Sequence, residues 1–230
     1  MKKKLTAQGP RDRKSYTVTL PIEWVKAERL DKLKSVELEA VGNKIVISPE
    51  KELQETVIVN SSEYPRNLIK VMQGLYRTGV NEIRFIFNKS EVLQELHNII
   101  DAYLIGYEIV EQKKDYVIIK NITKESEESF STVLRRIFLL MLELSESEDK
   151  IHAQSIHKSI KRLINYCQRI LVKRGYHEYV KTPLYYLLLD RLEKISDEFK
   201  WIYLLDLDKQ EQRQIKEMSG IFRHIYEIFY

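Results

Sequence analysis

The 230-residue sequence predicts an α+β fold in three parts. Apolar and polar residues alternate in a short run near the N-terminus, which is the period of a half-buried strand. Strand and helix patterns alternate through the middle of the chain, and the C-terminal part repeats its apolar residues with the period of a helix. We therefore expect a strand-rich module, a small α/β sandwich and an antiparallel helical bundle, over residues 1–52, 53–122 and 123–230.

The first module begins with a predicted strand. Tyr16, Val18 and Leu20 share one face of this strand, and the polar residues between them share the other. Pro21 ends the strand and suits the first turn of a helix, which the spacing of apolar residues predicts over 22–30.

Two more strands, "SVELEAV" and "KIVIS", flank Gly42-Asn43, a dipeptide that favours a tight hairpin turn. The module is therefore predicted as β-α-β-β. It holds too few apolar side chains for a core of its own, so we expect it to form a homodimer.

The middle of the chain, residues 55–121, alternates between strand and helix patterns in the order β-α-β-α-β-β. Gly79 and Gly106 stand where the two helices are expected to end. This order predicts a small α/β sandwich.

From Glu127 onward the pattern is helical. The predicted helices are amphipathic with wide apolar faces, and their short connections make neighbouring helices antiparallel in a bundle of three or four. They are expected near 127–147, 151–174, 181–206 and 210–229.

Composition indicates a soluble, cytoplasmic protein. Cys167 is the one cysteine and has no partner for an internal disulfide, which fits a reducing compartment. The start "MKKKLTAQGP" has positive charges but no apolar stretch behind them, so it is not a signal peptide. The apolar runs "IFLLML" and "PLYYLLL" are far too short for a membrane span.

Positive charge is concentrated at the N-terminus. Residues 1–34 hold ten Lys and Arg against four Asp and Glu, a net charge of +6, whereas the remaining residues carry −2. A basic module of this kind is suited to a polyanionic partner such as double-stranded DNA. The candidate DNA contacts are Lys4, Arg11, Arg13 and Lys14; the alternative is that they form a solvated basic arm.

The same module resembles a known family. "YTVTLPIEWV" followed by "LDKLKSVELEAVGNKIVISPE" is similar to the AbrB/SpoVT/MazE swapped-hairpin domains, which have a strand running into Leu-Pro, a short helix, a Gly-Asn turn and an Ile-Val-Ile strand. Lys34-Ser35 departs from the Gly-Asp usual in the family. The resemblance implies an interleaved homodimer with basic strands and loops toward DNA.

The rest of the chain resembles archaeal PhoU-like regulators. "YPRNLIKVMQGLYRTGVNEIRFIF" and "IIDAYLIGYEIVEQKKDYVIIKN" are similar to their connecting α/β region, and "FSTVLRRIFLLMLE" and "YYLLLDRLEKISDEFKWI" to helices of the PhoU bundle. This resemblance implies a regulator of phosphate uptake that contacts a phosphate transporter or a sensor kinase. It also implies a metal cluster held by carboxylate motifs.

Glu193 and Asp197 match the family's Glu-x-x-x-Asp motif and share a helix face. The preceding predicted helix, "SIHKSIKRLINYCQRILVKRG", contains no acid, and His157 and Lys161 stand where acids are expected. We therefore expect that the metal cluster is lost and that there is no cofactor, although two carboxylates could still hold a divalent metal. Two alternatives are a solvated helix face and an ion-pair cluster of Lys161 and Arg162 with both carboxylates.

No motif indicates catalysis. The sequence has no Gly-rich phosphate loop and no nucleophile elbow, and its five histidines form no ligand set, so an enzyme is not expected. The sequence predicts a DNA-binding transcriptional regulator of phosphate uptake that acts as a dimer. The alternative is a PhoU-like adaptor that docks on a phosphate transporter or sensor kinase and does not bind DNA.

Overall fold

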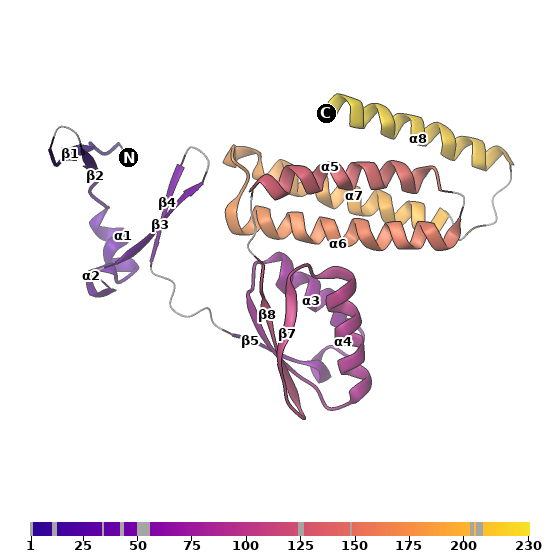
Figure 1. The fold of residues 1–230 in the computed structure, drawn as a ribbon, viewed down its shortest axis with the longest axis horizontal. Helices are drawn as coiled ribbons and strands as arrows, with labels where there is room; N and C mark the ends of the chain where they lie inside the picture. The colour runs from indigo at the N-terminus through magenta and orange to yellow at the C-terminus, as the bar shows by residue number, and fades with distance from the viewer. Residues whose placement is uncertain are drawn as a thin grey trace. The chain divides into compact units, whose positions relative to one another are not determined.

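The computed structural model confirms the α+β fold class (Figure 1). It describes residues 2–10, 13–33, 35–41, 44–49, 56–123, 127–147, 149–202, 205 and 209–230. The chain divides into two compact units: unit 1, Met1–Leu53, and unit 2, Gln54–Tyr230. Unit 2 contains both the α/β sandwich and the helical bundle.

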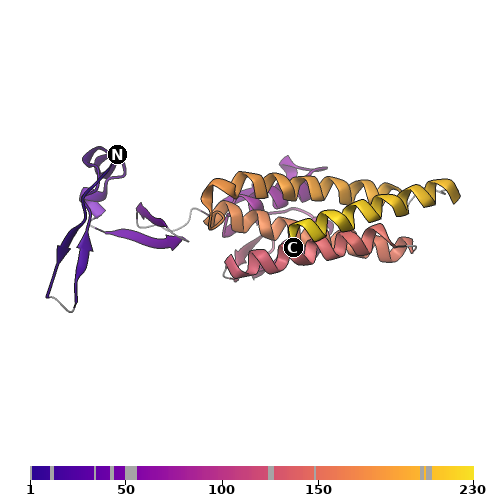
Figure 2. The ribbon, with the colours of Figure 1, turned by 90° about the horizontal axis from the view of Figure 1, so that it is seen from above.

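Unit 1 consists of two antiparallel hairpins joined by two short helices (Figure 2). Its order is β-β-α-α-β-β. The elements are β1 (Thr6–Gln8), β2 (Ser15–Thr17), α1 (Ile22–Ala27), α2 (Leu30–Leu33), β3 (Val36–Val41) and β4 (Lys44–Pro49).

Two details of unit 1 differ from the sequence prediction. β1 is an additional strand that pairs with β2, so that Thr6 lies opposite Thr17. The helix expected over 22–30 is interrupted at Arg29, whose φ of 54° is incompatible with a continuous helix. The Gly42-Asn43 turn lies outside the described residues, but Val41 pairs with Lys44 on either side of it.

The α/β sandwich has a four-stranded sheet in the order β5-β6-β8-β7. β5 is parallel to β6, and the other neighbours are antiparallel. Its elements are β5 (Val57–Asn60), the 3₁₀ turn η1 (Ser61–Glu63), α3 (Leu68–Arg77), β6 (Glu82–Ile86), α4 (Ser90–Tyr103), β7 (Tyr107–Gln112) and β8 (Tyr116–Asn121).

Helices α3 and α4 cover one face of this sheet (Figure 1). Every second residue of β6 and β8 points to them, because side chains alternate along a strand. The fully buried residues Ile83, Phe85, Val117 and Ile119 form one core with Met72 of α3.

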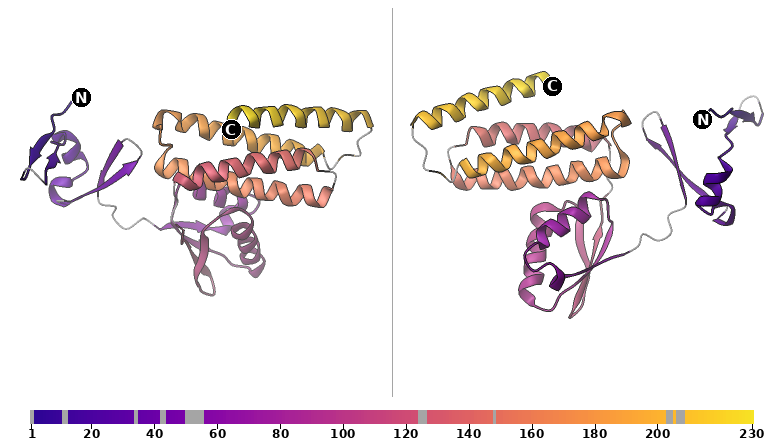
Figure 3. Two further views of the ribbon diagram at one scale, coloured as in Figure 1. Left: turned by 45° about the horizontal axis from the view of Figure 1, so that its top comes forward. Right: turned by 180° about the vertical axis from the view of Figure 1, so that it is seen from behind.

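The bundle consists of four helices in the predicted positions (Figure 3). Its elements are α5 (Glu127–Ser145), α6 (Lys150–Arg174), the 3₁₀ turn η2 (Tyr179–Lys181), α7 (Thr182–Ile202) and α8 (Lys209–Phe229). α5, α6 and α7 pack against one another, and α8 packs against α5. α6 also packs against α3 and α4, which joins the two parts of unit 2. Within the described part of the chain, every helix is too short or too polar to cross a membrane.

Gly106 is required by the turn between α4 and β7. Its φ is 83°, and a Cβ there would meet Thr123 Oγ1 and lie 2.7 Å from Asn121 Oδ1. Gly106→Ala should therefore destabilise unit 2 by at least about 1–2 kcal/mol, the cost of a left-handed residue with a side chain. Chemical denaturation measures this change.

Gly74→Ala is the matched control. Gly74 lies inside α3 with open space around the position of a Cβ, so alanine should stabilise by about 0.5–1 kcal/mol. If Gly106→Ala and Gly74→Ala change the free energy of unfolding equally, the left-handed turn described for Gly106 is wrong.

Candidate functional site

Three of the four predicted DNA contacts lie around the β1–β2 hairpin. Lys4 precedes β1, and Arg13 and Lys14 lie in the loop that leads into β2; all three side chains are exposed. The loop depends on Gly9, whose φ is 102° and whose Cβ would lie 2.7 Å from Arg13 O. Arg11 lies outside the described residues. The hairpin thus holds Arg13 and Lys14 at the surface, next to a short two-stranded ladder.

Unit 1 leaves its apolar residues uncovered. Among its described residues, Leu30 is the one buried apolar side chain. Tyr16 is 65% exposed and Ile45 is 71% exposed, although both belong to strands. The other exposed apolar residues are Leu5, Val18, Ile22, Leu38 and Val46. The described part of unit 1 thus covers few of its apolar residues by itself, in line with the shortage of core residues from which the sequence predicted a dimer.

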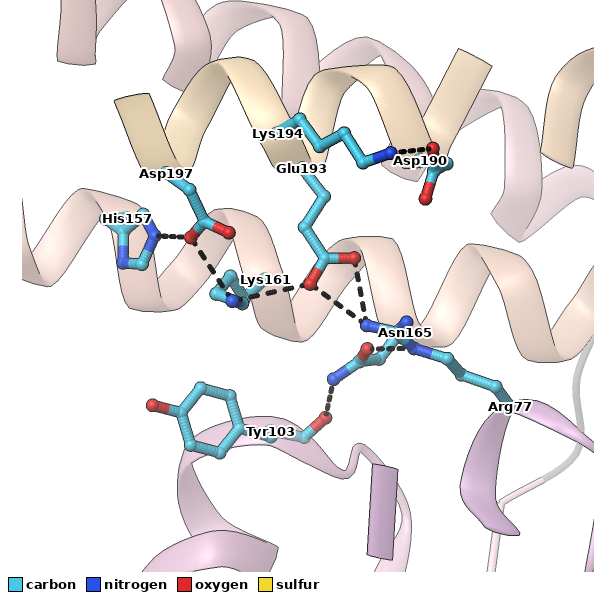
Figure 4. A network of polar contacts seen from close by, with 9 residues as sticks. All are labelled: Arg77, Tyr103, His157, Lys161, Asn165, Asp190, Glu193, Lys194 and Asp197. Atoms are coloured by element: carbon cyan, nitrogen blue, oxygen red, sulfur yellow. Dashed lines mark hydrogen bonds and ion pairs between the residues drawn. The ribbon is translucent and has the colours of Figure 1, made fainter. Parts of the chain in front are cut away.

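A second candidate site lies between α6 and α7 (Figure 4). Lys161 Nζ is 3.4 Å from Glu193 Oε1 and 3.2 Å from Asp197 Oδ1. His157 Nε2 is 2.7 Å from the same Asp197 oxygen. His157, Lys161 and Asn165 follow at intervals of four residues, so they share the face of α6 that meets α7. We call these residues, together with Glu193, Asp197 and Arg77, the ion-pair cluster.

The cluster extends into the α/β sandwich. Arg77, the last residue of α3, donates from Nη2 to both oxygens of Glu193, at 3.1 and 2.9 Å, and from Nε to Asn165 Oδ1 at 2.7 Å. Asn165 Nδ2 donates to Tyr103 O at 3.1 Å. The cluster therefore links four helices, α3, α4, α6 and α7.

Three of the four residues in the predicted ion-pair cluster come together, and Arg162 does not. Arg162 is exposed, because it follows Lys161 and successive residues of a helix point about 100° apart. Arg77, which the sequence did not indicate, supplies the second cation of the cluster and binds Glu193. In the sequence, Arg77 stands out only as a basic residue at the end of an amphipathic helix. That pattern does not reveal that its partner Glu193 lies more than a hundred residues away.

In the ion-pair cluster, burial and hydrogen bonding shift the pKa values of Asp197 and His157 in opposite directions. Burial raises the pKa of Asp197, but the hydrogen bonds from His157 and Lys161 outweigh it, and the net shift is downward. Burial lowers the pKa of His157, and its hydrogen bond to Asp197 offsets only part of that shift. At neutral pH the cluster thus contains an ionised Asp197 and a neutral His157.

This arrangement does not fit a divalent metal at Glu193 and Asp197. Both carboxylates are within ion-pair distance of Lys161, and Glu193 also binds Arg77. A metal ion would have to displace these cations and would find few other ligands. Among the described residues, no three His, Cys, Asp or Glu side chains are grouped as a metal site requires.

Arg169 is a fully buried charge that the sequence did not indicate. It lies on α6 and donates from Nη1 to Tyr76 O at 2.9 Å and to Val80 O at 2.7 Å, and from Nη2 to Asn81 Oδ1. Its guanidinium also lies over the ring of Tyr76, 5.0 Å from the centroid. Arg169 thus satisfies carbonyl groups at the C-terminal end of α3.

The comparisons with known proteins concern unit 1. A protein-family model described as "Antidote-toxin recognition MazE, bacterial antitoxin" matches residues 13–55. The match begins at Arg13 of the cationic loop and includes α1, α2, β3 and β4. No curated protein and no solved structure matches the chain. Residues 13–55 are therefore similar to a MazE-type domain, and the match does not extend into the bundle.

Replacement of Arg169 tests its role in unit 2. Arg169→Met keeps most of the side-chain volume but leaves the carbonyls of Tyr76 and Val80 without this donor, so unfolding should become easier by about 2 kcal/mol or more. Arg162→Met, on the exposed side of the same helix, should change stability by less than about 0.5 kcal/mol. If Arg169→Met lowers the free energy of unfolding by no more than Arg162→Met does, Arg169 does not stabilise the contact between the α/β sandwich and the bundle.

Acid should destabilise unit 2 through His157. Because its folded pKa lies below the ordinary 6.5, the unfolded chain binds this proton more tightly. The stability due to neutral His157 is therefore complete above pH 6.5 and is lost as the pH falls from there toward the folded pKa. Denaturant melts between about pH 8 and about pH 5 should show this slope in the wild type and a flatter one in His157→Gln. If the wild type and His157→Gln lose stability equally as the pH falls, the acid sensitivity comes from groups other than His157.

Proposed function

We propose that the chain is a cytoplasmic, non-catalytic regulator that binds double-stranded DNA as a homodimer through unit 1. One observation carries the proposal: the unit that has the chain's excess positive charge also leaves its apolar residues exposed. A second copy would cover the apolar residues and double the positive charge in the same step.

The need for a second copy follows from the small size of unit 1. Its described strands form two separate two-stranded ladders, and a two-stranded hairpin is only marginally stable in water. Their edges are open, and Leu38, Ile45 and Val46 are exposed on β3 and β4. Pairing with another unit 1 would bury these residues, as in the swapped-hairpin dimers that the sequence resembles. The MazE-type match over residues 13–55 supports the same pairing.

DNA binding follows from the charges that the dimer would share. Lys4, Arg13 and Lys14 are exposed around one hairpin, and each copy contributes the same set. Lys and Arg placed against phosphates release counterions, which favours binding to a polyanion. We assign the DNA contacts to these residues and to Arg11, which belongs to the same basic stretch of the sequence.

We further propose that the DNA-binding dimer regulates phosphate uptake. The resemblance of the bundle helices to PhoU supports this assignment. In this proposal the bundle receives the signal through a partner protein and not through a metal, because cations of the chain itself occupy Glu193 and Asp197. The alternative remains an adaptor that docks on a phosphate transporter or sensor kinase and uses unit 1 only to dimerise.

DNA binding should be strongly salt-dependent. If about six phosphates are neutralised, the logarithm of the binding constant should fall with the logarithm of the salt concentration with a slope of about −5. Arg13→Ala combined with Lys14→Ala removes four cations from a dimer, so the slope should flatten by about 3–4 and binding at physiological salt should be lost. Fluorescence anisotropy with a labelled duplex measures both quantities.

Lys113→Ala combined with Lys114→Ala is the matched control. These two exposed lysines lie in the turn between β7 and β8 of unit 2, so their loss removes the same charge from the dimer. The control should keep the wild-type slope. If the wild type binds no duplex at low salt, or if both double variants lose affinity equally, unit 1 does not bind DNA and the adaptor is favoured.

A further inference from the structure

Helix α8 carries two apolar stripes, of which α5 covers one. Phe222 and Tyr226 face Phe138 of α5, with ring centroids 5.9 and 6.2 Å apart, and Ser219 Oγ lies 3.0 Å from Ser145 Oγ. Figures 1 and 3 both show α8 as an outer helix of the bundle beside α5. Phe229 also contacts Tyr185 of α7, with ring centroids 6.3 Å apart, and other apolar residues of α8 remain exposed.

The second stripe consists of Met218, Ile221, Ile225 and Ile228, which we call the seam. Each seam residue directly precedes a residue of the first stripe, so the seam lies about 100° around the helix from it. All four are exposed, from 45% for Ile225 to 74% for Ile228. Four large aliphatic side chains in one exposed row are characteristic of an interaction surface.

The spacing of the seam identifies the kind of partner. Its residues follow at intervals of three, four and three, which is the a/d pattern of a helix that pairs with one other helix. A membrane surface would favour basic residues beside the apolar row. Here the flanking charges are of both signs: Arg213 pairs with Glu217 within α8 at 3.6 Å, and Arg223 pairs with Glu146, the residue after α5, at 2.6 Å. The seam therefore fits a partner helix that presents a row of uncharged side chains.

We propose that the seam of α8 pairs antiparallel with the seam of α8 in a second copy of the chain. In this register Ile221 lies opposite Ile225 of the second copy and Met218 lies opposite Ile228, so each layer is aliphatic and contains no charge. The exposed row on α7 is less suitable, because the charged Arg191 stands between Leu187 and Ile195.

The pairing rests on the proposed dimerisation of unit 1. One four-residue seam on each chain is small beside the roughly 1,200–2,000 Å² of a standard interface, so it would not hold two free chains together. Two chains already joined through unit 1 have a high effective concentration of one α8 for the other, which makes a weak contact sufficient. The two bundles of one dimer would then be held together.

Disulfide trapping in the full-length chain tests both the contact and its direction. Ile221→Cys combined with Ile225→Cys places a cysteine of each helix opposite a cysteine of the other in the antiparallel register, whereas a parallel pair would place like positions opposite each other and would also cross-link the single variants. In either single variant the two cysteines stand at the same residue number in both chains. In the antiparallel register these two positions are offset by four residues along the helix axis, about 6 Å, in addition to the distance between the helices, so a disulfide cannot form. Cys167 is fully buried and should not react.

Mild oxidation should therefore give a covalent dimer of the double variant on a non-reducing gel and none of either single variant. Ile151→Cys, at an exposed position on α6, is the control and should remain monomeric on the gel. Circular dichroism checks that all variants are folded, as expected for exposed positions.

Sedimentation under reducing conditions separates the two proposals. If the chain sediments as a dimer and the double variant gives no covalent dimer, or if single variants cross-link equally well, the antiparallel seam is wrong and the proposed dimer of unit 1 is not contradicted. If the chain sediments as a monomer, the proposed dimer of unit 1 fails and the seam pairing fails with it.

Discussion

The proposed function depends on one constraint, the inability of unit 1 to cover its own apolar residues. Its described part buries Leu30 and leaves Tyr16, Leu38 and Ile45 in contact with water. The hydrophobic effect therefore favours a second copy, and each copy brings its cationic loop with it. Stability and charge are coupled in this way, since the association that completes the fold would also produce the surface for a polyanion.

Unit 2 buries apolar cores of its own, and polar contacts join its α/β sandwich to its bundle. Arg169 is buried against carbonyls at the end of α3, and Arg77 and Asn165 connect the ion-pair cluster to α3 and α4. Hydrogen bonds of this kind fix geometry, because a buried charge or carbonyl is costly when its partner is lost. The α/β sandwich and the bundle thus form one unit.

Most helices of unit 2 could be predicted from the sequence, because apolar periodicity and helix-ending residues such as Gly79 and Gly106 are local signals. β1 was missed because its three residues, Thr6–Gln8, show no apolar alternation. The break at Arg29 is a single backbone angle that no residue pattern marks. Arg77 and Arg169 were missed for a different reason, since their partners are distant in sequence and only the packing of α6 on α3 brings them together.

The central claim is that unit 1 is folded only as a dimer. Hydrogen exchange measured by mass spectrometry over a dilution series tests it directly. We expect peptides from β1 to β4 to lose protection as the chain is diluted below the dimer dissociation constant, while peptides from β6, α5 and α6 keep theirs at every concentration. Protection of unit 1 that is unchanged in samples shown by sedimentation to be monomeric would contradict the account.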